Sequence, residues 1–263
     1  MNRREAALLA SGCTAILAGL GLPALAPVWW IGRSLLGLSD HVADPRTVAL
    51  TFDDGPHPEG TPRVLDFLSE RGLRATFFLV GEQVVRRPGL ASEIASRGHE
   101  IGLHGYEHRT LSRLTGRELS EDLKRAVHVI SSATGKVPDL YRPPRGVFTY
   151  RGLQMIHRLG WHPVLWAADG RDWRGSATAD SISRRVTEGL RGGEVILLHD
   201  SDHYGSPCSW RNTVAALPLI VGALEIKGLG ATCVTSSSML LGRSIDARFG
   251  EQALLLSRAD SRA

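Results

Sequence analysis

The stretch Thr51-Phe52-Asp53-Asp54-Gly55-Pro56 ends an apolar, β-branched run with two carboxylates and a Gly-Pro pair. The run predicts a buried strand over 48–52, and Gly-Pro predicts a sharp turn directly after it. Successive side chains of a strand point to opposite faces. The two aspartates are therefore expected to have different tasks, one toward a metal and the other toward a reacting water. An ordinary turn or helix cap is the alternative interpretation.

Outward from this strand, short β-branched or aromatic runs alternate with longer segments of helical period. Strands are predicted at 48–52, 75–80, 100–103, 140–142, 162–166, 194–199 and 231–235. Helices are predicted at 61–71, 89–96, 120–134, 151–159, 179–190 and 211–226. Left-handed helix ends are expected at Gly72, Gly98, Gly135 and Gly228. The repeated alternation predicts an α/β barrel whose catalytic groups gather at the carboxyl ends of its strands.

The third predicted strand runs into His104-Gly105-Tyr106-Glu107-His108. Two histidines four residues apart lie on one face of a helical turn, where both imidazoles can bind one transition metal. Together with one carboxylate they leave coordination positions open for water and a substrate carbonyl, as hydrolysis needs. The pattern therefore predicts a hydrolytic metal site at the strand ends.

These two segments resemble the first two motifs of the polysaccharide deacetylase family, the NodB-type carbohydrate esterases of family 4. Segments similar to the other motifs follow in order: Tyr141-Arg142-Pro143-Pro144-Arg145-Gly146, Trp166-Ala167-Ala168-Asp169-Gly170-Arg171-Asp172-Trp173 and Ile196-Leu197-Leu198-His199-Asp200. The resemblance spans about 47–235, and five ordered motifs are far more specific than one. It implies a distorted (β/α)7 barrel of the NodB type.

The resemblance also implies roles for residues of the first three motifs. One divalent ion, usually Zn²⁺ and in some members Co²⁺ or Mn²⁺, would be held by Asp54, His104 and His108. Asp53 would be the general base, and Arg142 would pair with it. The implied reaction is removal of N-acetyl groups, or of O-acetyl groups, from a cell-envelope or chitin-like polysaccharide or oligosaccharide.

The later motifs would supply the general acid and the walls of the substrate site. His199 would protonate the leaving amine, and Asp172 would orient it. Trp173 would pack on a sugar ring, with burial in the core as the alternative, and Leu198 would line an acetyl pocket. Family members commonly carry an aromatic residue where this chain has Arg145. This cation predicts a preference for glycans that bear carboxylate or phosphate.

Other candidate ligands have no partner at ligand spacing. His57 follows the Gly-Pro turn and His203 lies in a polar loop, so both are interpreted as surface residues. The cysteines, Cys13, Cys208 and Cys233, contain no pair at metal-ligand spacing, which excludes a zinc ribbon or a thioredoxin-like redox pair. A disulfide between Cys208 and Cys233 would require an approach of their Cα atoms that spacing does not establish.

The amino terminus differs from the rest, because Arg33 is the only charged residue between Ala6 and Leu38. About 20 apolar residues cross a bilayer, so this segment predicts a transmembrane helix that anchors an extracytoplasmic catalytic domain in the membrane. Secretion after signal cleavage is the alternative, because Ala24-Leu25-Ala26 resembles a cleavage site. A buried helix of a soluble protein is the third interpretation.

Three parts are predicted: an anchor or signal segment with a linker at 1–44, a catalytic domain at 45–236, and a tail at 237–263. Among the 263 residues, 43% are hydrophobic and 22% charged, which is typical of a folded globular domain. The net charge of +4 comes from interspersed charges without a dense basic block. No nucleic-acid partner is therefore predicted, and no protein partner is evident.

Two other functions fit the same motifs. The first is a metal-dependent amide hydrolase that acts on a small non-sugar substrate, since a fold alone does not fix an activity. The second is a catalytically silent glycan-binding protein. The presence of every polar position of the predicted site argues against the second alternative, because a silent protein would be expected to lose costly charged groups.

Overall fold

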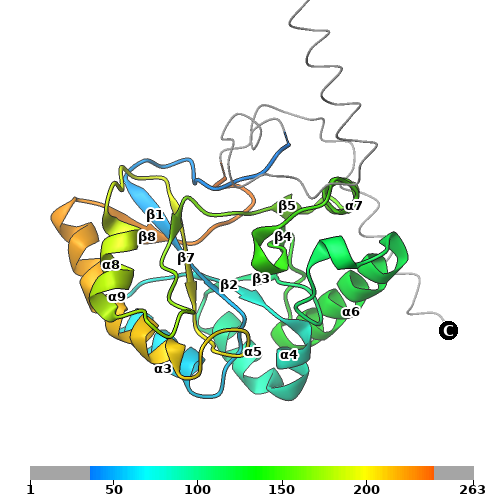
Figure 1. Ribbon diagram of the computed structural model, residues 1–263, viewed down its shortest axis with the longest axis horizontal. Coiled ribbons are helices and arrows are strands. Elements are labelled where there is room, and N and C mark those ends of the chain that lie inside the picture. The colour runs from blue at the N-terminus through cyan, green and yellow to red at the C-terminus, as the bar shows by residue number, and fades with distance from the viewer. Residues whose placement is uncertain (1–35, 240–263) are drawn as a thin grey trace, which may run out of the picture.

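The computed structural model describes residues 36–239, in which parallel strands form one sheet that curves into a distorted barrel (Figure 1). The sheet order is β5-β4-β3-β2-β1-β7-β6, and β8 pairs with β1 outside this path. The strands are β1 Thr47–Asp53, β2 Thr76–Leu79, β3 Glu100–Leu103, β4 Leu140–Tyr141, β5 His162–Pro163, β6 Ala168–Asp169, β7 Val195–His199 and β8 Gly230–Thr232. The predicted distorted α/β barrel is confirmed.

Helices cover the outside of the sheet (Figure 1). They are α3 Gly60–Glu70, α4 Gly81–Arg86, α5 Pro88–Ser96, α6 Gly116–Thr134, α7 Tyr150–Arg158, α8 Ala179–Thr187 and α9 Ser209–Ile226. The longest, α6, begins at Gly116 rather than at the predicted 120, because Thr115 and Glu118 form a reciprocal capping box. It ends at Thr134, and the φ of +68° at the following residue, Gly135, confirms the predicted left-handed end.

Some elements are too short to carry a periodic signal in the sequence. Helix α4 has 6 residues and β6 has 2, and neither is predicted by periodicity. The strand predicted at 162–166 ends at Pro163, and Val164 pairs with Ser39 only in an isolated parallel bridge. The backbone N–H of Leu165 donates to the carbonyl of Ser39 over 2.7 Å.

Residues 39–42, expected as part of a polar linker, pair with the barrel. The backbone N–H of Ser39 donates to the carbonyl of Pro163 over 3.0 Å, and the carbonyl of Asp40 accepts the N–H of Val195, also over 3.0 Å. Strand β5 is one end of the sheet path, and β7 lies next to the other end. The segment therefore bridges the opening between the two ends of the curved sheet.

The two faces of β1 show how the barrel is filled. Its outward face joins the main apolar core between sheet and helices and carries Val48, Leu50 and Phe52. Its inward face begins with Ala49, which packs in a smaller apolar cluster with Phe78, Leu140, Val164, Val195 and Val234. The next inward positions are Thr51 and Asp53. The barrel interior is therefore apolar at the amino ends of the strands and polar at their carboxyl ends.

The predicted transmembrane helix needs correction. Among residues 36–239, no helix combines the length and the apolar character that crossing a bilayer requires. The segment that suggested the helix, 6–38, falls largely outside the described residues, as does most of the tail at 237–263. Cys208 and Cys233 are both free thiols, so the disulfide considered between them is absent.

Candidate active site

Each of four strands ends with a polar residue at the same mouth of the barrel. Asp53 is the last residue of β1 and lies opposite His199, the last residue of β7. His104 directly follows β3, and Arg142 directly follows β4. Asp172 lies three residues beyond the end of β6. Because parallel strands share their carboxyl edge, residues far apart in the chain meet there.

Asp53 and Asp54 approach the same imidazole, which strand alternation does not predict. Asp53 Oδ2 lies 3.7 Å and Asp54 Oδ1 3.4 Å from Nε2 of His104. Alternation would send the two carboxylates to opposite faces, but Asp54 has a left-handed φ of +76°, which turns its side chain back toward the mouth. Their other partners differ, because Arg142 donates to Asp53 whereas His108 Nε2 lies beside Asp54.

The turn after Asp54 packs against a second buried carboxylate. A Cβ atom on Gly55 would lie 2.6 Å from both carboxylate oxygens of Asp200, so only glycine fits this position. Asp200 is fully buried and accepts a hydrogen bond from the hydroxyl of Thr61. Burial raises the pKa of Asp200 to about 7. Asp200 therefore packs directly against the turn at Gly55 and supports it.

Three donor atoms converge beside Asp54. Its Oδ1 and the Nε2 atoms of His104 and His108 lie within 4.8 Å of one another. Oδ1 is buried, and although His108 Nε2 is 3.2 Å away, no contact to Oδ1 within the described chain has hydrogen-bond geometry. Burial alone would raise the pKa of Asp54, but the two imidazoles lower it well below its ordinary value. A buried, ionised carboxylate beside two imidazoles fits a divalent transition-metal ion.

His104 and His108 do not lie on a helical turn, contrary to the prediction. Residues 104–108 form a loop, and His108 has a φ of +48°. Asp122 of α6 holds this loop by accepting the backbone N–H of Tyr106 over 2.8 Å. The imidazole centroids still lie 5.1 Å apart, so the loop brings together the two rings that a helical turn was expected to align.

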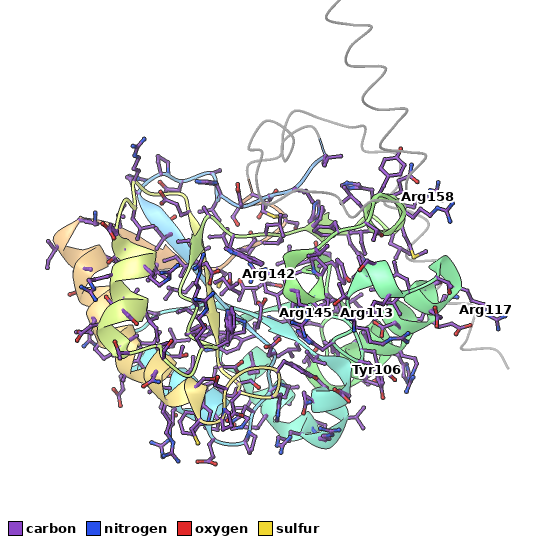
Figure 2. All side chains as sticks on the ribbon, in the orientation of Figure 1. Tyr106, Arg113, Arg117, Arg142, Arg145 and Arg158 are labelled. Atoms are coloured by element: carbon purple, nitrogen blue, oxygen red, sulfur yellow. The ribbon has the colours of Figure 1, made fainter. Side chains whose placement is uncertain are left out.

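Arg142 is fully buried near the centre of the molecule (Figure 2). Its Nη1 donates to Asp53 Oδ1 over 2.7 Å and to Thr51 Oγ1 over 2.8 Å. These bonds fix the orientation of the Asp53 carboxylate. The carbonyl of Arg142 lies 2.9 Å from Nδ1 of His104. It therefore accepts the Nδ1 proton, which leaves the Nε2 lone pair for a metal.

His199 is held by a carboxylate on the side away from the candidate metal ligands. Asp172 is fully buried, and its Oδ1 lies 2.7 Å from Nδ1 of His199. Its Oδ2 accepts the backbone N–H of His199 and the hydroxyl of Thr213, each over 2.7 Å. Burial would lower the pKa of His199, but the charge and hydrogen bond of Asp172, followed by Asp54 and Asp53, raise it to about 10. Asp172 thus favours the protonated, imidazolium form of His199.

This raised pKa predicts the alkaline limit of activity. If catalysis needs protonated His199, kcat/KM should fall as the pH rises through the pKa of His199, and Asp172→Asn should move that limb to lower pH. The alkaline limb of kcat/KM is measured for the parent and for Asp172→Asn with the same bound metal. The cation then acts on the pKa of His199 in both proteins. Asp169→Asn is the control, since Asp169 accepts the backbone N–H of Arg171 instead. An unmoved limb in Asp172→Asn would contradict the assignment.

Two of the predicted substrate residues are exposed. The side chain of Trp173 is 40% exposed, which contradicts the alternative of core burial, and the guanidinium of Arg174 lies 5.0 Å from its ring centroid. Arg145 is exposed and has a left-handed φ of +63°. Burial is the main cause of the lowered pKa of His108, and the positive charge of Arg145 adds to it, so this cation lies near the metal site.

Leu198 is fully buried in the main core, on the outward face of β7. Its contact with an acetyl group stays a prediction. Leu197 points to the same inward face as His199, because the two residues are two positions apart on a strand. Leu197 is thus a further candidate for lining the mouth, which strand alternation alone could have identified.

His57 and His203 are not isolated surface residues. His57 is 7% exposed, and together with Asp202 the two histidines form a second group of metal-type donors. However, Nδ1 of His57 accepts backbone N–H groups from Glu59 and Gly60. Its Nε2 therefore carries the proton and faces Asp202 Oδ1 at 3.1 Å. This tautomer has no lone pair for an ion on that side, so the group is a hydrogen-bonded brace rather than a metal site.

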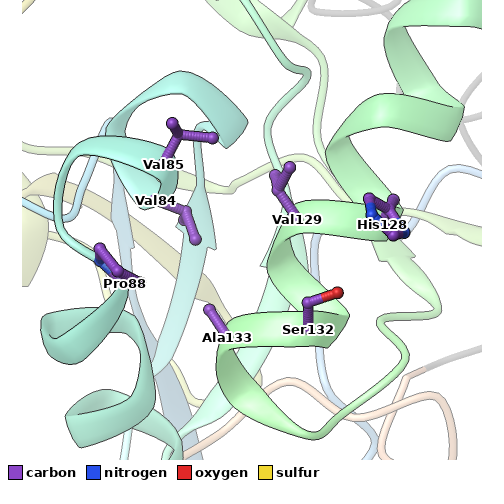
Figure 3. Close-up of a pocket in the computed structure, with 7 residues that line it drawn as sticks. All are labelled: Val84, Val85, Pro88, His128, Val129, Ser132 and Ala133. Atoms are coloured by element: carbon purple, nitrogen blue, oxygen red, sulfur yellow. The ribbon is translucent and has the colours of Figure 1, made fainter.

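An apolar cavity of about 260 Å³ lies apart from the candidate catalytic residues, and its lining residues are drawn in Figure 3. It is lined by residues of α4, α5 and α6, including Val84, Pro88, Val129 and Ala133. None of the candidate catalytic or metal-binding residues lines this cavity. This cavity is therefore separate from the candidate active site.

The sequence model of the polysaccharide deacetylase family matches residues 40–164. A peptidoglycan-N-acetylglucosamine deacetylase of Bacillus cereus is 36% identical over 197 residues, which cover 74% of this chain and 88% of that protein. A chitooligosaccharide deacetylase of Azorhizobium caulinodans is 30% identical, covering 74% of this chain and 96% of its own. A crystal structure of a peptidoglycan N-acetylglucosamine deacetylase superposes with a TM-score of 0.73 at 30% identity, covering 81% and 96% of the two chains. This chain belongs to the polysaccharide deacetylase family.

Proposed function

We propose that this protein is a metal-dependent deacetylase that removes N-acetyl groups from a cell-envelope polysaccharide, of the peptidoglycan or chitin-like type. The convergence of Asp54, His104 and His108 beside the separately held Asp53 carries this proposal. The relatives named for peptidoglycan and chitooligosaccharides support the substrate class. Zn²⁺ is the proposed ion, with Co²⁺ or Mn²⁺ as alternatives, because imidazole and carboxylate ligands suit all three.

When bound, the divalent cation supplies positive charge that polarises the acetyl carbonyl and makes water at the site more acidic. Asp53, oriented by Arg142, accepts the proton from the attacking water. The backbone N–H of Arg145 is proposed to donate to the oxyanion that develops on the carbonyl oxygen. His199 gives a proton to the leaving nitrogen, so that the products are acetate and a free amine.

We propose that the catalytic domain, 45–236, acts outside the cytoplasm. Peptidoglycan and other envelope glycans lie there, and a relative named for peptidoglycan aligns with this chain over 88% of its length. The site also opens at a barrel mouth with an exposed Trp173, which suits a long polymer better than a small enclosed ligand.

The proposal is tested by acetate release from acetylated chito-oligosaccharides, peptidoglycan and small acetamides. We expect release from the glycans, loss of activity after chelation, and recovery when Zn²⁺, Co²⁺ or Mn²⁺ is added. An O-acetylated glycan in the same panel separates ester from amide hydrolysis. Release from the small acetamides alone would support the small-substrate amidase, and metal binding without any release would support a silent glycan-binding protein.

The same panel tests the proposed role of Arg145 in selecting the substrate. Arg145 is exposed, and a guanidinium binds carboxylate or phosphate with paired hydrogen bonds. Arg145→Tyr is expected to lower the ratio of kcat/KM for anionic over neutral oligosaccharides by about two- to fivefold, since one exposed charged contact is lost. Arg117→Tyr, a change at an exposed arginine of α6, is the control. An unchanged ratio in Arg145→Tyr would contradict a role for Arg145 in selecting anionic glycans.

A further inference from the structure

The two histidine ligands of the proposed metal site are supported in different ways. Nδ1 of His104 is fixed by the carbonyl of Arg142, as is usual for a metal-binding imidazole. For Nδ1 of His108, residues 36–239 supply no hydrogen-bond acceptor, and its recorded polar contact is between Nε2 and Asp54. His108 also sits in a loop with a left-handed φ. Its ring plane must therefore be fixed by something other than a hydrogen bond at Nδ1.

Tyr204 supplies that support by stacking. Its ring lies almost parallel to the imidazole of His108, with the centroids 3.9 Å apart and the planes 9° apart. A flat ring pressed on one face prevents the imidazole from rotating out of its plane. The face of a tyrosine ring is electronegative, so this contact becomes more favourable when a bound cation draws electron density from the imidazole.

The Tyr204 ring is itself anchored through α4. Its hydroxyl donates to Glu82 Oε1 over 2.6 Å and accepts from Nε2 of Gln83 over 3.2 Å. The backbone N–H of the same Glu82 donates to the carbonyl of Tyr106, two residues before His108, over 2.9 Å. The start of α4 thus holds both the loop that carries His108 and the ring that covers it.

We propose that Tyr204 is a positioning residue for the metal ligand His108, and that it raises metal affinity by holding the imidazole with its Nε2 toward Asp54. This inference rests on the proposed metal site. Tyr204 lies in the loop after β7, outside the five motifs, and contacts no reacting atom. Its role is exerted through His108 alone.

Metal affinity tests the proposal directly. Dissociation constants for Zn²⁺ and Co²⁺ are measured on the full chain by competition with a chromophoric chelator. Tyr204→Leu removes the flat ring and is expected to weaken binding by about 10–100-fold, the usual effect of losing an outer support of a metal ligand. Tyr204→Phe keeps the ring and is expected to lose clearly less affinity than Tyr204→Leu, because stacking remains while the two hydroxyl bonds are lost.

Tyr150→Leu is the matched control, since Tyr150 is 54% exposed at the start of α7 and is expected to leave both constants unchanged. The melting temperature of each variant is measured with chelator and with saturating metal, and the difference isolates binding from any loss of fold stability. Equal constants for Tyr204→Leu and the parent protein would overturn the proposal, as would equal losses in the Phe and Leu variants. If the parent protein binds metal but releases no acetate, the proposed function is wrong. The measured effect of Tyr204 on metal affinity would still stand.

Discussion

Replacing Asp53 with Asn is expected to lower kcat by about 10²–10⁴-fold, because the reaction loses its general base. The amide oxygen can still accept the hydrogen bond that Arg142 donates to Oδ1, but the amide cannot take a proton from water. Asp53 is not one of the three proposed ligands, so metal content should stay close to that of the parent. Acetate release at saturating glycan, with the metal content of the same sample, measures both effects.

Asp66→Asn is the control for this change. Asp66 is an exposed carboxylate that pairs with Arg97 on the outside of the barrel. We expect unchanged kcat in that variant. A kcat for Asp53→Asn within a few fold of the parent would mean that another group accepts the proton, and loss of metal would mean that Asp53 is a ligand after all.

Replacing Arg142 with Met is expected to lower the free energy of unfolding by about 3–5 kcal/mol, because it leaves a buried carboxylate without its cation. Arg142 is fully buried, and Asp53 is 2% exposed. The substitution also removes the donors to Thr51 and to the carbonyl of Leu165. Urea unfolding in the presence of a chelator measures this change in free energy without any contribution from metal binding.

A double-mutant comparison separates the charge effect from lost packing. In an Asp53→Asn background, Arg142→Met should lower the free energy of unfolding by less, because no buried negative charge is left unpaired. Arg117→Met is the control at the surface, where the arginine side chain is 88% exposed and pairs with Glu121. We expect a change of about 0.5 kcal/mol or less there. An equal cost of Arg142→Met in both backgrounds would contradict a role for the charge pair.

The residues at strand ends could be predicted because two signals agreed on them. Buried β-branched runs locate the strands, and the carboxyl edge of a parallel sheet is where catalytic groups meet. Asp53, His104 and His199 follow from this rule, and the resemblance to a family added their roles. The rule does not give side-chain direction after the strand ends, which is why the left-handed turn at Asp54 was missed.

The supporting residues could not be predicted for a different physical reason. Asp122 and Thr213 lie on helices, and Tyr204 lies in a loop, each far along the chain from the group that it holds. Their partners are set by how the helices and loops pack on the sheet, which leaves no periodic pattern. The burial of His57 is of the same kind, because the rings of His203 and Trp210, far along the chain, pack against its imidazole.

The pairing of Val42 with Met239 has a practical consequence for tethering the protein. Val42 also bonds to the carbonyl of Gly193, just ahead of β7, whereas His199 closes that strand. Val42 and Met239, which lie near the two ends of the described range, are therefore at the amino ends of the strands, opposite the catalytic residues. A bead or fusion partner attached near Val42 or Met239 would therefore leave the catalytic end of the barrel facing outward. That orientation suits an insoluble glycan, which cannot diffuse to the enzyme.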